Sequence, residues 1–396
     1  MSRPGRRSCP AMTTLVQIPS DPAPQPSPAP SARRGTSNFI QEEASHRRGI
    51  PLQRLLAGGM RYADAIALLA AADSGIEWAG AGAWLGDRNL RLAQAASTDE
   101  SRRRCLRFAS ACFRFGQLSL VKDTGRKKLL SHRKTQSFAD AAALDQPVTE
   151  RHEIEWRHGR LCGWLMRPRI ISSRSVVIII GGFDGWCEEH YLGAKQLIGR
   201  GMAVLLLDGP GQGDTRLFHD LYFDTDFHEA FSTAANYLRT RCDMDRMGIW
   251  GNSLGGCLAA KTVAFDPQFD ALCVNGGTAR PLDLPERHPR FFDKIEAFVG
   301  TTDRIRLLAV MQTLDLHLDS ARIRCPLLQL HGVPDSVFKL ADARVIHDRA
   351  STTDKTLMLW VDGDHCLYNH WEERNMCAAD WFAARLGKKP INANSM

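Results

Sequence analysis

The sequence predicts an α/β protein in which a mostly parallel sheet is covered by helices on both faces. Three observations support this fold class. From residue 176 onward, short apolar strands alternate with helical segments, as in parallel βαβ units. Residues 38–146 show helical periodicity and almost no strand signal, which predicts a separate all-helical domain. A glycine-rich turn that contains Ser253 joins one apolar strand to the helix that follows it.

The composition narrows the function classes. The chain of 396 residues is 44% hydrophobic, which is enough for a sizeable core in two or three domains. Its formal charge of +7 is uneven, because residues 1–150 carry +9 and residues 151–396 carry −2. The basic excess comes without clustered aromatic residues or a nucleic-acid-binding motif, so we interpret it as a solvated helical surface and a basic tail. We therefore expect no nucleic-acid partner.

The sequence also predicts a cytoplasmic protein that does not associate with a membrane and binds no metal. The apolar run Val176–Ile180 is too short to span a bilayer, and the N-terminus lacks the apolar segment of a secretory signal. The 11 cysteines include no Cys-x-x-Cys pair, and their irregular spacing indicates neither a zinc site nor a disulfide framework. We expect reduced, mostly buried thiols.

The first predicted segments are a tail and a helical domain. Residues 1–37 are rich in proline, serine, alanine and arginine, and the prolines within 21–30 exclude a regular helix or a central strand. We expect this tail to be disordered, and the sequence leaves open whether Met1 or Met12 is the natural start. Residues 38–146 form the predicted helical lid domain, with helices expected over 61–71, 101–121 and 127–143.

Residues 147–390 form the second predicted domain. An antiparallel pair of strands is expected at 153–156 and 161–166, joined by a turn. The alternating part follows, with strands at 176–180, 202–207, 247–250, 271–274, 326–330 and 356–361 and helices at 189–200, 227–241, 338–349 and 372–386. Residues 276–320 interrupt this alternation with helical patches and no strand, so we expect a helical insertion over the strand ends.

The turn around Ser253 has the pattern of a nucleophile elbow. Gly251–Gly255 fits Gly-x-Ser-x-Gly, with an apolar strand before it and a helix of small residues after it. Such a turn holds the serine in a sparsely populated backbone conformation, so its neighbours have to be small. By itself the pattern is a weak signal, because many proteins contain a Gly/Ser turn by chance.

Two further strand ends strengthen this interpretation. Asp335 follows the strand at 326–330, and His365 follows the strand at 356–361. The carboxyl ends of parallel strands meet at one edge of a sheet, so the three side chains are expected to converge. The order Ser…Asp…His is that of α/β-hydrolases. We predict that Ser253 is the nucleophile, that His365 is the general base and acid, and that Asp335 orients the imidazole.

The same reasoning predicts an oxyanion hole. One donor is the N–H of Leu254, directly after the nucleophile, and the second is the Phe183 amide in the loop 181–185. The loop 208–213 lacks the spacing of a dinucleotide-binding fingerprint, because position 214 is Asp. We expect that loop to line the floor of the pocket instead.

Several segments carry a resemblance to a known family. They are Arg104–Phe113, Gly181-Gly182, Asp208–Gly213, Gly251–Gly256, His331-Gly332 with Asp335, Gly363–Cys366 and Ala379–Trp381. The chain resembles α/β-hydrolases of the 2,6-dihydropseudooxynicotine hydrolase-like group and, more distantly, FrsA-like esterases and fungal hydrolases that shorten polyketides. The resemblance implies a helical lid domain, a Ser-Asp-His triad, no cofactor and a homodimer. It also implies an extra acid near the serine, for which Glu286 is the candidate, with a solvated lid residue as the alternative interpretation.

The predicted function is that of a cofactor-independent serine hydrolase. Its substrate is expected to be a small or medium, partly apolar molecule of aromatic or polyketide-like character, and the bond cleaved is an ester or a C–C bond beside a ketone. Two alternatives stay open at this point: an acyltransferase or cyclase that uses the same acyl-enzyme, and a non-catalytic binding or regulatory protein on a hydrolase scaffold. A binder has no need of nucleophile, base and orienting acid together, which argues against the second alternative.

Overall fold

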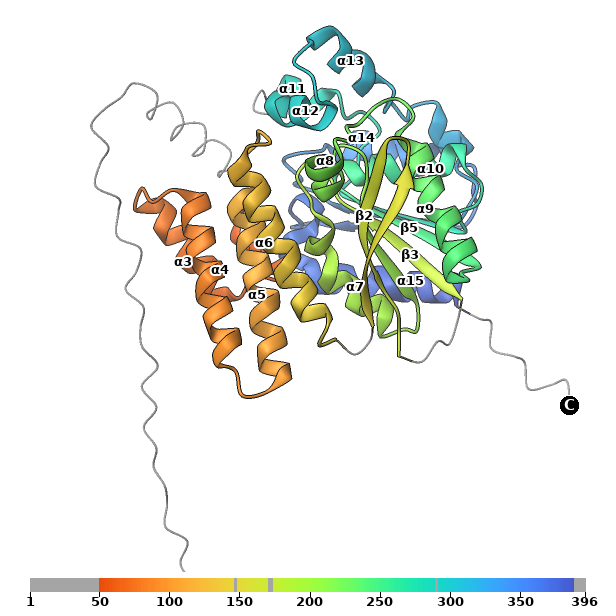
Figure 1. The fold of residues 1–396 in the computed structure, drawn as a ribbon. Helices are drawn as coiled ribbons and strands as arrows, with labels where there is room; N and C mark the ends of the chain where they lie inside the picture. Colours follow the sequence, from red (N-terminus) through yellow and green to blue (C-terminus); the bar gives the residue numbers. More distant parts are fainter. Residues whose placement is uncertain (1–49, 146–147, 170–173, 289–290, 388–396) are drawn as a thin grey trace, which may run out of the picture.

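The computed structural model describes residues 50–145, 148–169, 174–288 and 291–387 (Figure 1). One sheet of eight strands forms the centre of the described part, and a group of helices lies beside it. The predicted proline-rich tail, residues 1–37, lies outside the described residues.

The strands and helices have the following bounds. The strands are β1 (Thr149–Trp156), β2 (Gly159–Met166), β3 (Ser175–Ile180), β4 (Ala203–Asp208), β5 (Arg246–Asn252), β6 (Ala271–Asn275), β7 (Leu327–Gly332) and β8 (Lys355–Trp360). The helices are α2 (Leu52–Ala57), α3 (Tyr62–Asp73), α4 (Trp78–Ala95), α5 (Asp99–Gln117), α6 (Gly125–Ala142), α7 (Tyr191–Ile198), α8 (Gly213–His219), α9 (Phe227–Cys242), α10 (Leu254–Phe265), α11 (Asp283–Arg287), α12 (Phe291–Val299), α13 (Arg304–Gln312), α14 (Leu340–Arg349) and α15 (Trp371–Leu386), with the 3₁₀ helices η1 (Cys187–His190), η2 (Asp319–Arg322) and η3 (His365–His370).

The sheet is parallel except at one edge. Its strand order is β1-β2-β4-β3-β5-β6-β7-β8. β1 and β2 form the predicted antiparallel hairpin, β2 runs antiparallel to β4, and all pairs from β4 to β8 are parallel. The predicted fold class, an α/β protein with a mostly parallel sheet, is therefore confirmed.

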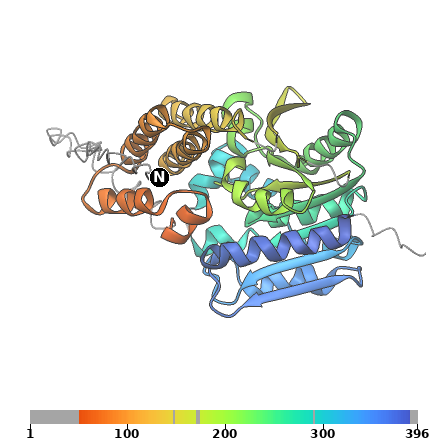
Figure 2. The same cartoon turned by 90° about the horizontal axis from the view of Figure 1, so that it is seen from below.

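Helices cover both faces of the sheet because its central strands are apolar on both sides. In β3, Val176 and Ile178 belong to the core layer that contains residues of α9, α10 and α14. Val177 and Ile179 belong to the opposite layer, which contains residues of α7 and α15. Side chains alternate between the two faces along a strand, so a strand that is apolar throughout needs cover on both. Figure 2 shows α15 lying along the sheet.

Helices α2–α6 form a layer beside the sheet (Figures 1 and 2). The sequence analysis did not single out α4, which packs closely on α5: a Cβ at Gly82 would lie 2.5 Å from Gly116 Cα. The side chain of Thr98 caps the first turn of α5. α6 joins this layer to the sheet, since the Phe138 ring lies 4.8 Å from the Trp164 ring of β2. The division of the chain into domains stays a prediction.

The region 276–320 contains α11, α12, α13 and η2, and no strand among its described positions. Figure 1 shows α11–α13 grouped at one end of the sheet. The Phe298 ring of α12 stacks on Phe223 at 4.5 Å and lies 5.2 Å from the Phe183 ring. This region therefore packs against the loop that follows β3.

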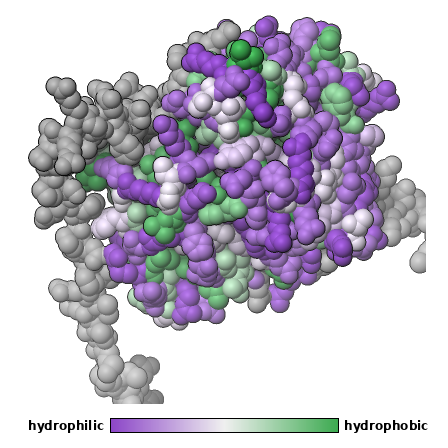
Figure 3. Space-filling view, turned by 45° about the horizontal axis from the view of Figure 1, so that its top comes forward, coloured by the Kyte–Doolittle hydropathy of each residue, from purple (hydrophilic) through white to green (hydrophobic). Residues whose placement is uncertain are grey.

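The surface is mostly polar on the face shown in Figure 3, where hydrophobic side chains form separate small groups. Exposed apolar residues that occur singly are normal for a folded protein. Among the described residues, no helix has the length and apolar character needed to cross a membrane.

We predict that Gly82→Ala destabilises the protein by about 1–3 kcal/mol, because the new methyl group would overlap the α5 backbone. The free energy of unfolding from urea titration measures this change. The matched control is Gly125→Ala, where a Cβ would meet nothing within 4 Å and the stability should change by less than about 0.5 kcal/mol. Equal stability of both variants would contradict the close packing of α4 on α5.

Candidate active site

Ser253 lies in a sharp turn between β5 and α10. Its backbone has φ 58° and ψ −128°, in the left-handed region that non-glycine residues rarely adopt. Two glycines make the turn possible: a Cβ at Gly251 would lie 2.0 Å from the carbonyl oxygen of Gly255, and one at Gly255 would lie 2.3 Å from that of Gly181. The Ser253 amide donates to the Asn275 carbonyl at 2.9 Å, which ties the turn to β6. The Ser253 hydroxyl is thereby held at the end of the sheet.

The structure brings Ser253, His365 and Asp335 into one hydrogen-bonded chain. His365 Nε2 lies 2.9 Å from Ser253 Oγ, and His365 Nδ1 lies 2.8 Å from Asp335 Oδ2. The other oxygen, Asp335 Oδ1, accepts from the amides of Val337 and Phe338 at 2.7 and 3.0 Å. The carboxylate is therefore fixed by the loop after β7 and presents its free oxygen to the imidazole.

Buried charges favour the protonated form of His365. Burial acts to lower the pKa of His365, but the neighbouring Cys366 and the Asp335 carboxylate outweigh it and raise the pKa well above its ordinary value. Burial acts to raise the pKa of Asp335, but His365 and the Phe338 amide outweigh it and hold the pKa below its ordinary value. An imidazole in this setting accepts a proton readily, as a general base has to do.

The loop after β3 and the start of α10 lie beside the Ser253 hydroxyl. A Cβ at Gly182 would lie 3.2 Å from Ser253 Oγ and 3.4 Å from the Leu254 nitrogen, so the loop after β3 passes directly over the serine. Within the described part of the chain, neither the Leu254 amide nor the Phe183 amide donates to a protein acceptor. Free backbone N–H groups at this place are what a developing oxyanion needs.

The loop 208–213 does not line the pocket floor, and this prediction was wrong. None of its residues contacts the cavity at Ser253. Gln212 Nε2 instead donates to the carbonyls of Gly181 and Gly182 at 2.6 and 3.0 Å, and Asp208 Oδ1 accepts from the Cys187 amide at 2.8 Å. The loop therefore supports the Gly181–Gly185 loop from behind through the Gln212 side chain.

Ser253 and His365 border a cavity of about 340 Å³. Phe183, Phe291 and Val337 supply apolar wall. Four charged side chains of the polar wall pair with one another, namely Arg54, Asp184, Glu189 and Lys294, and the Asp364 carboxylate also borders the cavity.

Arg54 holds the polar wall together. Its Nε donates to Glu189 Oε1 at 2.9 Å and its Nη2 to Asp184 Oδ1 at 3.1 Å, while Lys294 pairs with the second oxygen of Asp184. Burial acts to raise the pKa of Asp184, but Arg54 and Lys294 outweigh it and hold the pKa far below its ordinary value. Arg54 comes from α2 and Lys294 from α12, so the helical layer and the 276–320 region both contribute to the wall of the cavity.

The charged residues of the polar wall were not predictable from the sequence. Arg54 lies 135 positions before Glu189, and no motif or periodicity links the two. Glu189 was expected at the start of a helix over 189–200, but it lies in the 3₁₀ helix η1, so its inward position had no local signal. Predicting them would have required knowing how α2 packs on the sheet.

Glu286 lies in α11, and its side chain is outside the described residues. Asp364, next to His365, accepts from the Asn369 amide at 3.2 Å and so stabilises the turn at the start of η3.

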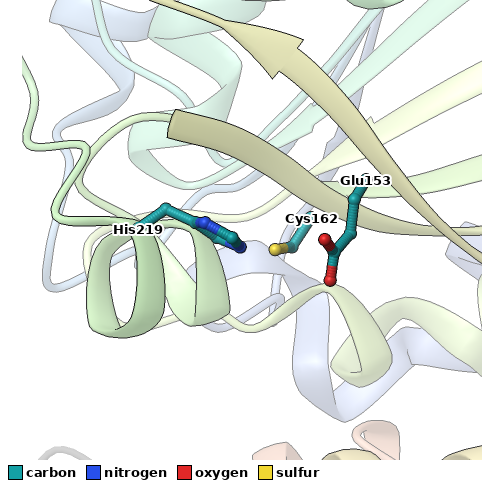
Figure 4. Close-up of side chains that lie close together, drawn as sticks. All are labelled: Glu153, Cys162 and His219. Carbon is teal, nitrogen blue, oxygen red and sulfur yellow. The ribbon is translucent and has the colours of Figure 1, made fainter. Parts of the chain in front are cut away.

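One group of side chains away from this cavity has the chemistry of metal ligands. Glu153, Cys162 and His219 point toward one another from β1, β2 and α8, with ligand atoms within 4.8 Å (Figure 4). Burial raises the pKa of the Cys162 thiol to about 12, and Arg160 Nη1 donates to Glu153 at 3.1 Å. None of the three borders the cavity at Ser253, so a metal held there would not contact the serine.

The strand order and the turn that carries Ser253 define the class of protein. The chain is an α/β-hydrolase, with an N-terminal group of helices beside the hydrolase sheet.

Comparisons with known proteins agree with this class. A model of the prolyl oligopeptidase family matches residues 192–388. The chain is 28% identical over 351 residues to 2,6-dihydropseudooxynicotine hydrolase of Paenarthrobacter nicotinovorans, a match that covers 85% of this chain and 92% of that protein. The crystal structure of the 2,6-dihydroxy-pseudo-oxynicotine hydrolase has a TM-score of 0.75 at 25% identity, covering 85% of this chain and 96% of that one. The chain is therefore homologous to this hydrolase, as the resemblance predicted, and is itself a hydrolase.

A fungal protein is similar over a shorter stretch. The 20-hydroxy-prefusarin hydrolase FUS2 of Gibberella moniliformis is 37% identical over 145 residues, which is 34% of each chain.

Proposed function

We propose that this α/β-hydrolase is a cofactor-independent serine hydrolase in which Ser253 is the nucleophile, His365 the general base and Asp335 the orienting acid. One observation carries the proposal: the hydrogen bonds of 2.9 and 2.8 Å that run from Ser253 through His365 to Asp335 at the wall of a cavity. Serine is a weak nucleophile at neutral pH and needs a base that is itself held in position.

The reaction begins when Ser253 Oγ attacks a carbonyl carbon of the substrate. His365 Nε2 accepts the hydroxyl proton, and Asp335 stabilises the resulting imidazolium. The amides of Leu254 and Phe183 donate to the oxygen of the tetrahedral intermediate. His365 then gives its proton to the leaving group, which is an alkoxide in an ester or a stabilised carbanion in a C–C bond beside a ketone. Water, deprotonated by His365, releases the acyl group from Ser253.

The substrate we propose is a small or medium, partly apolar carbonyl compound. A cavity of about 340 Å³ lies within the size range of small-molecule sites. Phe183 and Phe291 offer aromatic contact to it, and the Arg54 and Lys294 cations of the wall are already paired with carboxylates, which disfavours an anionic substrate. Two similar proteins are named as hydrolases of 2,6-dihydropseudooxynicotine and of 20-hydroxy-prefusarin.

The helices before the sheet are proposed to act as a lid. Pro51 and Arg54 reach the cavity from this side, while Phe291 and Lys294 reach it from the 276–320 region. Water would then have access only to the position of attack. The homodimer, the cytoplasmic location, and the absence of a cofactor and of a nucleic-acid partner stay predictions, as does the role of Glu286.

We predict that Ser253→Ala lowers kcat by about 10⁴-fold or more, because no nucleophile remains. The assay uses aryl esters and aryl β-diketones of matched size, so that it also shows which bond the enzyme cleaves. The melting temperature should change little, since the hydroxyl lies at the edge of the core. Ser74→Ala, an exposed serine of the helical layer, serves as the control and should keep full activity. Turnover that survives in Ser253→Ala would exclude Ser253 as the nucleophile.

We predict that kcat/KM falls as the pH is lowered through a midpoint above 6.5, the ordinary value for histidine. The raised pKa of His365 means that the ring stays protonated to a higher pH than usual, and protonated imidazole is unable to accept the Ser253 proton. The pH profile of kcat/KM with an uncharged aryl ester measures the midpoint. Residual turnover of Asp335→Asn should show a lower midpoint, because the stabilising carboxylate is gone. A midpoint at or below 6.5 in the unmodified enzyme would contradict the assignment of His365.

A further inference from the structure

A second cavity, of about 330 Å³, lies between α5 and α7. We name it the α5–α7 pocket. It shares no lining residue with the cavity at Ser253. Its lining includes five cationic side chains, Arg103, Arg104, Arg107, Arg114 and Lys195, and only two carboxylates. The function proposed above makes no use of this pocket.

The carboxylates near the α5–α7 pocket leave part of its positive charge unpaired. Arg103 and Arg107 share Asp145, and Arg103 also contacts Glu100. The second lining carboxylate, Glu188, is engaged elsewhere, with Lys134 at 2.9 Å and with the Trp164 ring nitrogen at 3.0 Å.

Three cations that line the α5–α7 pocket have no carboxylate within ion-pair distance among the described residues. Arg104, Arg114 and Lys195 form no ion pair with any residue that the structure describes. Arg104 and Lys195 are exposed at the pocket rim, but Arg114 is buried, with 2% of its surface accessible. Burial lowers the pKa of Arg114 and outweighs the more distant carboxylates of Glu189 and Glu188, so the guanidinium is incompletely compensated and a bound anion would stabilise it.

Hydrogen-bond donors without a partner gather on the side of α5 that lines the pocket. Arg114 donates to the Gly58 carbonyl, but its Nε has no partner among the described residues, and the same holds for the Nε of Arg107 and the Oγ of Ser110. Ser110 is 1% exposed. Residues 107, 110 and 114 are spaced three and four apart, so their side chains lie on one face of the helix. All three line the α5–α7 pocket.

The rest of the lining is apolar or aromatic. The Arg107 guanidinium lies over the rings of Phe138 at 3.7 Å and Tyr191 at 4.3 Å, and with Nη2 paired to Asp145 and Nη1 donating to the Phe138 carbonyl, its Nε is the atom left for a ligand. Phe108 and Leu192 also contribute to the wall. A ligand that fits this lining carries an anionic group at one end and an apolar body at the other.

We propose that the α5–α7 pocket binds a small organic anion whose carboxylate or phosphate group is held by Arg114, Arg107 and Ser110. The guanidinium fork matches the two oxygens of such a group, and a hydroxyl donor beside it satisfies a further lone pair. The apolar part of the ligand packs against Phe108, Tyr191 and Leu192. Arg104 and Lys195 at the rim attract the anion from solvent.

Calorimetric titration of the full-length protein tests this site, with phenyl phosphate as the first probe. We expect one phenyl phosphate to bind per chain. Benzoate and inorganic phosphate, titrated separately, show whether the pocket prefers a carboxylate or a phosphate and whether the ring contributes. A protein with a phosphonate attached to Ser253 should bind phenyl phosphate with the same Kd, because the two cavities are separate.

Variants locate the bound anion. Arg114→Gln should weaken phenyl phosphate binding at least about tenfold, since a charge-assisted hydrogen bond is lost. Arg104→Ala should weaken it by a smaller factor. Arg102→Ala is the matched control: this arginine lies on the same helix, is exposed and does not line the pocket, so the Kd should not change. If circular dichroism shows that Arg114→Gln does not fold, the double variant Arg104→Ala, Lys195→Ala carries the test and should weaken binding several-fold.

Three results would overturn the proposal. The first is a Kd weaker than about 10 mM for both organic probes. The second is a Kd that is the same in the folded pocket variants as in Arg102→Ala. The third is loss of phenyl phosphate binding when Ser253 carries the phosphonate, which would assign the anion to the cavity at Ser253.

Discussion

The strained backbone of Ser253 is the constraint on which the site depends. A residue with φ 58° is kept there only if its surroundings allow no alternative. Gly251 and Gly255 supply that condition, because any side chain at either position would overlap a backbone oxygen. The turn thereby fixes the hydroxyl against the loop after β3, and the proposed oxyanion hole depends on the same geometry.

The loop after β3 is in turn held by buried polar contacts from several elements. Gln212 binds its two glycine carbonyls, and η1, which follows the loop, is anchored to the helical layer twice. Lys134 of α6 lies 2.9 Å from Glu188, and Arg54 of α2 lies 2.9 Å from Glu189. Buried ion pairs contribute little net stability because desolvation offsets their attraction, but they fix geometry and tolerate no loss of one partner. The helical layer therefore helps to set the position of the backbone beside Ser253.

Much of the fold was predictable because the periodicities are strong. The fully apolar β3 and β4 and the hairpin of β1 and β2 have clear signals, and apolar strands that alternate with helices indicate a parallel sheet covered on both faces. The convergence of Ser253, Asp335 and His365 was predictable for the same reason, since each follows a parallel strand. The helix α4 was not identified, because its small and polar residues mask the apolar face that packs on α5.

The residues that shape the two cavities were beyond sequence reasoning. Arg54 and Arg114 are charged side chains on helices, and sequence patterns assign such residues to solvent. Both are buried because the helical layer packs against η1, which no local pattern specifies. The prediction for the loop 208–213 was wrong for a similar reason: whether this loop borders the substrate or supports the neighbouring loop through Gln212 depends on tertiary packing.

The most direct test of the account is a crystal structure of the enzyme with a phosphonate attached covalently to Ser253. The account predicts that one phosphoryl oxygen lies about 2.7–3.1 Å from both the Leu254 and the Phe183 nitrogens, with His365 still bonded to Asp335. A phosphonate attached to another residue, or an oxygen that faces away from both amides, would contradict it.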